Sequence, residues 1–408
     1  MYNAPGRAGA APFDMEDAED TLLFARNDTK NARDIYRQRE HRKKALIAVA
    51  SIAAGLSALA LILGLAYGLR SRRVSYKCPP GFIADQADMV FFVVGDWGRG
   101  GSESQRKVAS MMAQLGGCYR PSFVVSTGDN FYESGLRGPE DPFFTQTFTD
   151  VYTDDSLMVP WYAVLGNHDY GELDREQLRL CSSPNFTNCP AGCCYSPTWQ
   201  TNMSNRDWRW NARQGAWRQG FGNGLLDIVF VDTSPFVTKY HSVPWANIAG
   251  GINSQDWESQ AALVQALLRN STAKWKLVVG HHPIRSYGEH CNGDGSGDCL
   301  DMQWLRPVMK RYKAAAYFCG HEHDLQLIKS KDSATPPDPV YYVVSGAGSD
   351  IRTGEFANVE PLTLQETSFF ADQGGFVAVV IKGNTMALHV WADRVATPAY
   401  AVDVTLPT

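Results

Sequence analysis

A recurring pattern of residues constrains the fold of this chain more than any other feature of its sequence. Five apolar runs of the kind that form β-strands each end in glycine followed by a residue type that binds metals. The five segments are MVFFVVGD, ending at Asp96, SFVVSTGD, ending at Asp129, WYAVLGNH, with Asn167 and His168, KWKLVVGHH, with His281 and His282, and AYFCGHEH, with His321 and His323.

Polar, helix-compatible segments separate these runs, and such alternation is typical of an α/β domain. Loops at the carboxyl ends of strands in such a domain converge on one crevice, so we expect the polar side chains to meet there. Taken singly, each Asp or Asn could instead cap a helix or form a turn. The two histidines of GHEH could instead belong to a solvated loop. Five such coincidences in one domain favour a shared site.

The residue types of the five segments suit two kinds of metal ion. Carboxylate and phenolate oxygens suit a hard, highly charged cation, whereas imidazole nitrogens and an amide oxygen suit a borderline divalent one. Asp129 lies midway in the set and is a candidate bridge between two ions, which can clamp a phosphoryl group. His321 and His323 are expected to serve neighbouring metals, while Glu322 between them points elsewhere and orients the loop.

Read in order, GDWG, GDNFY, GNHD, GHHP and GHEH resemble the purple acid phosphatases among the calcineurin-like metallophosphoesterases. The likeness runs from about Met89 to the C-terminus and is greatest to the small, tartrate-resistant type. Gly98 stands where protein serine/threonine phosphatases of this superfamily carry a histidine, which separates the chain from them. The resemblance implies a single catalytic domain over 89–408, folded as a four-layer α/β/β/α sandwich.

The resemblance also assigns residues to two metal positions. It implies that a ferric ion is bound by Asp96, Asp129, Tyr132 and His323. It implies that a divalent ion, which is iron, zinc or manganese in this family, is bound by Asn167, His281, His321 and the bridging Asp129.

The residues expected to contact substrate come from the same motifs. Asn167, His168 and His282 are the expected phosphate or pocket contacts, with mere lining of the pocket as the alternative for His282. Glu289 and His290 match a pair that protonates the leaving group, and Glu289 is expected to hold His290 in place. The alternative is that His290 only stabilises the loop before Cys291.

The function implied is an acid phosphatase that hydrolyses phosphate monoesters through a metal-activated hydroxide, without a covalent phosphoenzyme. A ferric ion lowers the pKa of water strongly, which suits acidic conditions. The expected partners are small phosphorylated substrates or phosphoproteins, and the net charge of −5 gives no reason to expect nucleic acid. Two alternatives are a phosphodiesterase or nucleotide hydrolase on the same site, and a binding ectodomain whose enzyme site is retired.

The first 88 residues predict a membrane attachment. Residues 1–44 are polar and read as a disordered cytosolic tail, and residues 70–88 as a stalk. Residues 45–69 carry no charge and as a helix would span roughly 37 Å at about 1.5 Å per residue, which predicts a transmembrane signal anchor. A buried core helix or a cleaved signal peptide is the alternative.

Charge and modification signals predict the orientation of that anchor. Basic residues are more numerous before residue 45 than just after residue 69, so the N-terminus is expected in the cytosol. The catalytic domain would then be luminal or extracellular, in the secretory or endolysosomal pathway or at the cell surface. Glycosylation sequons begin at Asn185, Asn202 and Asn270, all beyond the span.

All nine cysteines also lie beyond the span, which suits an oxidising compartment. Cys291 and Cys299 close a short glycine-rich loop and are expected to pair. Their number is odd, and Cys319, at the end of an apolar run, is the expected free thiol.

The predicted orientation can be tested in microsomes that contain the full-length protein. An epitope placed after residue 69 should survive protease until detergent is added, because the membrane separates it from the enzyme. A glycosidase should lower the mass of the full protein at the same time. Digestion of that epitope in intact microsomes would contradict this topology.

Overall fold

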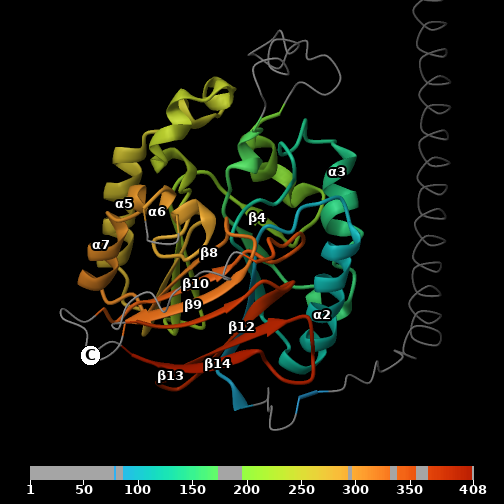
Figure 1. Ribbon diagram of the computed structural model, residues 1–408, viewed down its shortest axis with the longest axis vertical. Helices are drawn as coiled ribbons and strands as arrows, with labels where there is room; N and C mark the ends of the chain where they lie inside the picture. The colour runs from blue at the N-terminus through green and yellow to red at the C-terminus, as the bar shows by residue number, and fades with distance from the viewer. Residues whose placement is uncertain are drawn as a thin grey trace, which may run out of the picture. The chain divides into compact units, whose positions relative to one another are not determined.

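The computed structural model describes residues 78–79, 86–172, 195–292, 296–330, 338–354 and 366–406. These residues belong to one compact unit, which runs from Tyr76 to Thr408. Two seven-stranded sheets pack against each other, and helices cover their outer faces (Figure 1).

The first sheet joins a parallel half to an antiparallel half. Its strand order is β14 (Tyr400–Thr405), β13 (Thr385–Ala392), β12 (Gly375–Lys382), β1 (Met89–Val94), β2 (Phe123–Ser126), β3 (Trp161–Ala163) and β4 (Trp210–Ala212). Strands β1 to β4 are parallel, with Phe91 opposite Phe123, while β12 runs antiparallel to β1 with Val379 opposite Phe91. Strand β1 therefore lies at the junction of the two halves.

The second sheet contains four mutually parallel strands with antiparallel neighbours. Its order is β11 (Glu366–Ala371), β9 (Leu325–Ser330), β10 (Tyr341–Ser345), β8 (Ala316–Cys319), β7 (Trp275–Val279), β6 (Leu226–Phe230) and β5 (Trp217–Phe221). Strands β6, β7, β8 and β10 are parallel, and β5, β9 and β11 are antiparallel to their partners.

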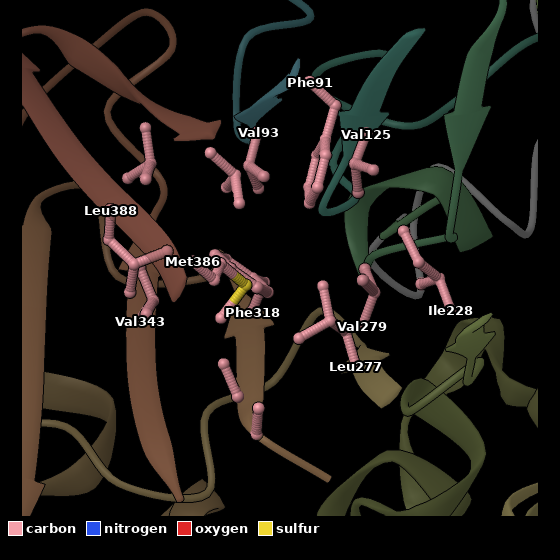
Figure 2. Packing of buried hydrophobic residues seen from close by; sticks show 14 of the residues in the cluster. Phe91, Val93, Val125, Ile228, Leu277, Val279, Phe318, Val343, Met386 and Leu388 are labelled. Carbon is pink, nitrogen blue, oxygen red and sulfur yellow. The ribbon is translucent and has the colours of Figure 1, made fainter. Parts of the chain in front are cut away.

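The main core lies between the two sheets. Side chains alternate along β1, so that Phe91 and Val93 face the second sheet while Phe92 and Val94 face the outer helices. Figure 2 shows Phe91 and Val93 together with Phe318 and other apolar side chains of both sheets in this core. Because strands in this part of the fold are buried on both faces, they appear in the sequence as unbroken apolar runs.

Helices form the two outer layers. On the first sheet, α2 (Glu103–Tyr119) contributes Val108, Met112 and Leu115 to the apolar cluster that also contains Phe92 of β1 and Phe376 of β12. Ser102 caps this helix by accepting a hydrogen bond from the backbone N–H of Gln105 at 3.3 Å.

On the second sheet, α5 (Trp257–Arg269) and α7 (Leu305–Arg311) contribute Val264, Leu268 and Met309 to the outer core. Two shorter helices are α3 (Pro142–Phe144) and α6 (Asp298–Asp301). The predicted four-layer α/β/β/α sandwich is thus confirmed.

Short 3-10 segments and a π-helical segment occupy many of the connections. They are a π-turn at Thr145–Thr149 and 3-10 turns at Asp155–Leu157, His168–Tyr170, Pro197–Asn205, Ser234–Phe236, Thr238–Ser242, Pro244–Asn247, Ile252–Ser254 and Glu289–Cys291. Those at His168 and Glu289 belong to segments that the sequence assigns to the site.

The described cysteines agree with the sequence. Cys291 and Cys299 form a disulfide, and Cys319 is a buried free thiol, so both predictions are confirmed. A second disulfide joins Cys78, in the predicted stalk, to Cys118 near the end of α2. Cys78 is therefore tied covalently to α2 within the compact unit.

The predicted anchor, residues 45–69, lies outside the described residues, and so does Asn185. Within the part of the chain that the structure describes, no helix combines the length and the apolar character needed to cross a membrane. The sequon residues Asn202 and Asn270 are both exposed.

Candidate metal centre

The five predicted segments meet at one place, because each follows the carboxyl end of a parallel strand. Asp96, Asp129 and Asn167 follow β1, β2 and β3 of the first sheet, while His281 and His321 follow β7 and β8 of the second. Two groups of potential ligands are buried here: Asp96, Asp129 and His323 in one, and His281, His282 and His321 in the other. His321 and His323 thus belong to different groups, as their spacing predicts.

The first group is organised around the phenol of Tyr132. Its Oη atom lies 2.8 Å from Asp129 Oδ2, 2.9 Å from His323 Nε2 and 3.2 Å from Asp96 Oδ1. His323 Nε2 is 3.6 Å from Asp96 Oδ1. Three oxygen donors and one imidazole therefore point at one small volume, as the sequence predicts.

The second group shares Asp129 with the first. His281 Nε2 lies 3.0 Å from Asn167 Oδ1 and 3.5 Å from Asp129 Oδ2, the same oxygen that contacts Tyr132. His281 Nδ1 lies 2.9 Å from the carbonyl oxygen of Thr127, and a hydrogen bond there leaves Nε2 free to bind a metal. Asp129 Oδ2 is consequently in the position of a bridge.

His282 is part of the second group by proximity, but hydroxyl groups face both of its ring nitrogens. Thr233 Oγ1 lies 2.9 Å from Nδ1, and the Tyr240 hydroxyl lies 3.2 Å from Nε2. The side chain is completely buried. These contacts favour a role in shaping the pocket over direct metal binding.

Direct contact between loops explains why glycine precedes Asn167 and His321. A Cβ atom at Gly166 would lie 2.2 Å from Asp129 Oδ1, and one at Gly320 would lie 2.1 Å from Asp96 Oδ2. Asp96, Asp129 and His321 also adopt left-handed backbone conformations, with φ of 58°, 51° and 71°. Such conformations are unfavourable for residues other than glycine and are concentrated at functional sites.

Burial and the interactions between neighbouring ionisable groups shift the pKa values of the first group. Burial raises the pKa of Asp96 well above its usual range, and the Asp129 carboxylate raises it further. Burial also opposes ionisation of Asp129, but the neighbouring His281 and His168 outweigh it, and the pKa of Asp129 lies below its usual value. Burial, followed by the two carboxylates, raises the pKa of Tyr132 well above its usual value. A bound cation would favour the ionised forms of Asp96 and Tyr132, which are the forms that bind metals.

Burial favours the neutral form of the imidazoles in the second group, and the neutral form is the one that binds metals. Burial lowers the pKa of His281, and it lowers that of His321 well below the ordinary value. Oxygen-rich and nitrogen-rich donor sets that share one carboxylate fit a pair of metal ions of different hardness.

His168 lies at the open edge of the centre. Its backbone N–H donates to Asp129 Oδ1 at 3.0 Å, and its ring is 4.4 Å from that of Tyr132, centroid to centroid. Its Nδ1 is 2.7 Å from the carbonyl oxygen of Glu133 and 3.2 Å from Glu172 Oε2. Burial disfavours the imidazolium, yet Asp129 and Glu172 outweigh burial and raise the pKa of His168. A protonated His168 at this position would attract an anionic substrate.

The surroundings of His290 differ from the sequence expectation. Its Nδ1 lies 2.9 Å from Oε2 of the fully buried Glu322, the acid between the two histidines of GHEH. Glu289, expected to hold His290, is 61% exposed at its side chain and pairs instead with Arg352 at 3.3 Å. Because Glu322 is buried beside the site, it is better placed than Glu289 to hold His290. The proposed orienting role of the acid within GHEH is consistent with these contacts.

Sequence reasoning missed two arginines that border the site. The guanidinium carbon of Arg99 lies 3.8 Å from the centre of the Tyr132 ring, and Arg352 Nη1 lies 3.0 Å from His290 Nδ1. Arg99 directly follows GDWG, so its place beside a ligand motif was the only available signal. Arg352 lies in a loop after β10 that carries no ligand-like pattern.

Comparisons with known proteins agree with this geometry. The family model for calcineurin-like phosphoesterases matches residues 89–325. Purple acid phosphatase 3 of Arabidopsis thaliana is 36% identical over 296 residues, which cover 71% of this chain and 70% of the relative. Tartrate-resistant acid phosphatase type 5 of Homo sapiens is 30% identical over 290 residues, covering 64% of this chain and 72% of the relative.

A solved structure, GAP50, described as the anchor in the inner membrane complex of Plasmodium, shares the fold with a TM-score of 0.55 and 19% identity. It covers 78% of this chain, and this chain covers 89% of it. At that identity the likeness concerns the fold alone. The family match and the more similar plant and mammalian relatives establish the family. The chain belongs to the purple acid phosphatases of the calcineurin-like phosphoesterase family.

Proposed function

We propose that this dinuclear-metal acid phosphatase hydrolyses phosphate monoesters at a ferric and a divalent ion held by the seven residues named above. The observation that carries the proposal is the position of Asp129 Oδ2, which contacts both Tyr132 Oη at 2.8 Å and His281 Nε2 at 3.5 Å. One carboxylate is therefore available to two adjacent donor sets.

The division of the donors supports different ions at the two positions. Asp96, Asp129, Tyr132 and His323 supply mainly oxygen, which a trivalent ion prefers. Asn167, His281 and His321 supply one amide oxygen and two neutral imidazoles, which suit iron, zinc or manganese as a divalent ion. When bound, the two ions would activate water and neutralise charge on the phosphoryl group.

The protein side chains would orient the substrate and move the proton. His168, at the edge of the centre, is placed to contact a phosphoryl oxygen and stabilise its charge. His290 lies against the ring of His321, with 3.9 Å between ring centroids, and can deliver a proton to the leaving oxygen. Glu322 would hold His290 in that position.

Phosphodiester hydrolysis is the main alternative activity on the same site. We expect the purified protein to hydrolyse p-nitrophenyl phosphate much faster than bis(p-nitrophenyl) phosphate in acidic buffer, because a monoester presents more anionic oxygens to the metals and His168. Spectrophotometry of released nitrophenolate measures both rates. A preference for the diester would replace the monoesterase proposal, and no hydrolysis of either by metal-loaded protein would favour a binding role.

The ferric ion can be tested by spectroscopy. Tyr132→Phe should remove the visible charge-transfer band, because that band requires a phenolate bound to ferric iron. Asp129→Asn should lower the content of both metals and reduce activity to background, since it weakens the shared ligand. Absorption spectra and elemental analysis of both variants provide the measurements. Full activity with either ion missing would contradict a two-metal site.

The role of His290 can be tested by varying the leaving group. An alkoxide needs a proton in the transition state, and a positioned acid contributes about 10²- to 10⁴-fold, whereas nitrophenolate hardly needs that help. His290→Ala should therefore slow hydrolysis of an alkyl phosphate far more than hydrolysis of p-nitrophenyl phosphate. Equal losses on both substrates with unchanged metal content would leave His290 as a scaffold residue.

The proposed cellular arrangement is a single-pass membrane protein with its catalytic domain on the luminal or extracellular side. Support comes from the uncharged run 45–69 and the excess of basic residues before it. Two disulfides among the described cysteines and the exposed Asn202 and Asn270 fit an oxidising, glycosylating compartment.

A further inference from the structure

The two ring nitrogens of His321 have different surroundings. Its Nε2 lies 3.0 Å from Oδ2 of Asp298, a residue of the short helix α6. An ionised carboxylate can only accept a hydrogen bond, so this contact places the ring proton on Nε2. Nδ1 is then the nitrogen with a lone pair for a metal.

Asp298 is itself held from the other side. Asp298 is only 5% exposed, and its carboxylate lies 2.8 Å from Nζ of Lys239, which belongs to the turn Thr238–Ser242. A buried carboxylate is costly unless it is paired and hydrogen-bonded, and here a lysine and an imidazole N–H fill those roles. The chain Lys239–Asp298–His321 therefore leads from the half-exposed lysine inward to the metal centre.

A disulfide fixes the segment that carries Asp298. Cys299 follows Asp298 directly and is bonded to Cys291, which follows His290 directly, and both half-cystines are fully buried. The bond thus ties the segment with the proposed proton donor to the segment with the carboxylate behind His321. The rings of His290 and His321 are in contact at the same place, with 3.9 Å between their centroids and an angle of 38° between their planes.

We propose that Asp298 is a positioning residue for the divalent ion: it orients His321 and fixes its tautomer, and the Cys291–Cys299 disulfide holds Asp298 in place. The proposal rests on the proposed metal site. Carboxylates that hydrogen-bond the outer nitrogen of a metal-binding histidine typically change metal affinity by about 10- to 100-fold when removed.

The test uses Zn²⁺ titration of the metal-free full-length protein in detergent against a competing chelator. Asp298→Ala should weaken Zn²⁺ binding at the divalent site, which His321 serves, by about 10- to 100-fold. Asp298→Asn should lose less, because its amide oxygen still accepts the hydrogen bond. The double variant Cys291→Ser/Cys299→Ser should also weaken Zn²⁺ binding, and adding Asp298→Ala to it should cause little further loss, because both changes act through one contact.

Asp301→Ala is the matched control. Asp301 lies on the same helix and accepts hydrogen bonds from the backbone N–H and hydroxyl of Thr238, both at 2.8 Å, so its loss loosens α6 without removing the carboxylate at His321. Zn²⁺ affinity should stay near that of the wild type. Thermal unfolding of each metal-free variant separates loss of the fold from loss of the ligand contact.

Three results would overturn the proposal. Asp298→Ala with wild-type Zn²⁺ affinity would remove Asp298 from the site, and equal losses in Asp298→Ala and Asp301→Ala would reduce it to a scaffold residue. A folded double-cysteine variant with wild-type affinity would remove the disulfide from the role. A wild-type protein that binds no Zn²⁺ would instead contradict the proposed metal site itself.

Discussion

The metal centre depends on van der Waals contact between the backbone of one loop and the ligand side chain of the next. Gly166 lies directly against Asp129, and Gly320 against Asp96, with no room for a Cβ atom in either case. Gly166 follows β3 of the first sheet and Gly320 follows β8 of the second, so ligands from both sheets interlock. The apolar core between the sheets sets the spacing that these contacts require, and a shift of one sheet would separate the ligands.

This close approach concentrates buried charge. Two carboxyl groups, a phenol and three candidate ligand imidazoles lie buried close together, and repulsion from the ionised Asp129 disfavours ionisation of Asp96. Arg99 over the Tyr132 ring and Arg352 near His290 offset part of that repulsion. Bound cations would offset the rest, so metal binding and stability of the fold are thermodynamically linked.

The features that arise from local sequence patterns could be predicted from the sequence. Apolar runs that end in glycine and a ligand type predicted the strands, their shared edge and the residues gathered there, and a short loop between two cysteines predicted the disulfide Cys291–Cys299. The partners of the ligands could not be predicted in the same way. Asp298 and Glu322 meet His321 and His290 through packing between loops, and no spacing in the sequence encodes such a distance. Glu289 pairs with Arg352 for the same reason, because adjacency to His290 in sequence does not determine contact in space.

The pairing of β1 with β12 has a consequence for how the chain is made. Met89 on β1 lies opposite Ile381 on β12, so the strand that leads to Asp96 has one neighbour close in sequence and another that is synthesised almost last. All the proposed ligands, through His323, leave the ribosome while one edge of β1 is still unpaired. Such long-range pairing slows folding and leaves a strand edge open to wrong partners. The C-terminal strands carry none of the proposed ligands, yet their arrival during translation decides when the nascent chain can close its first sheet.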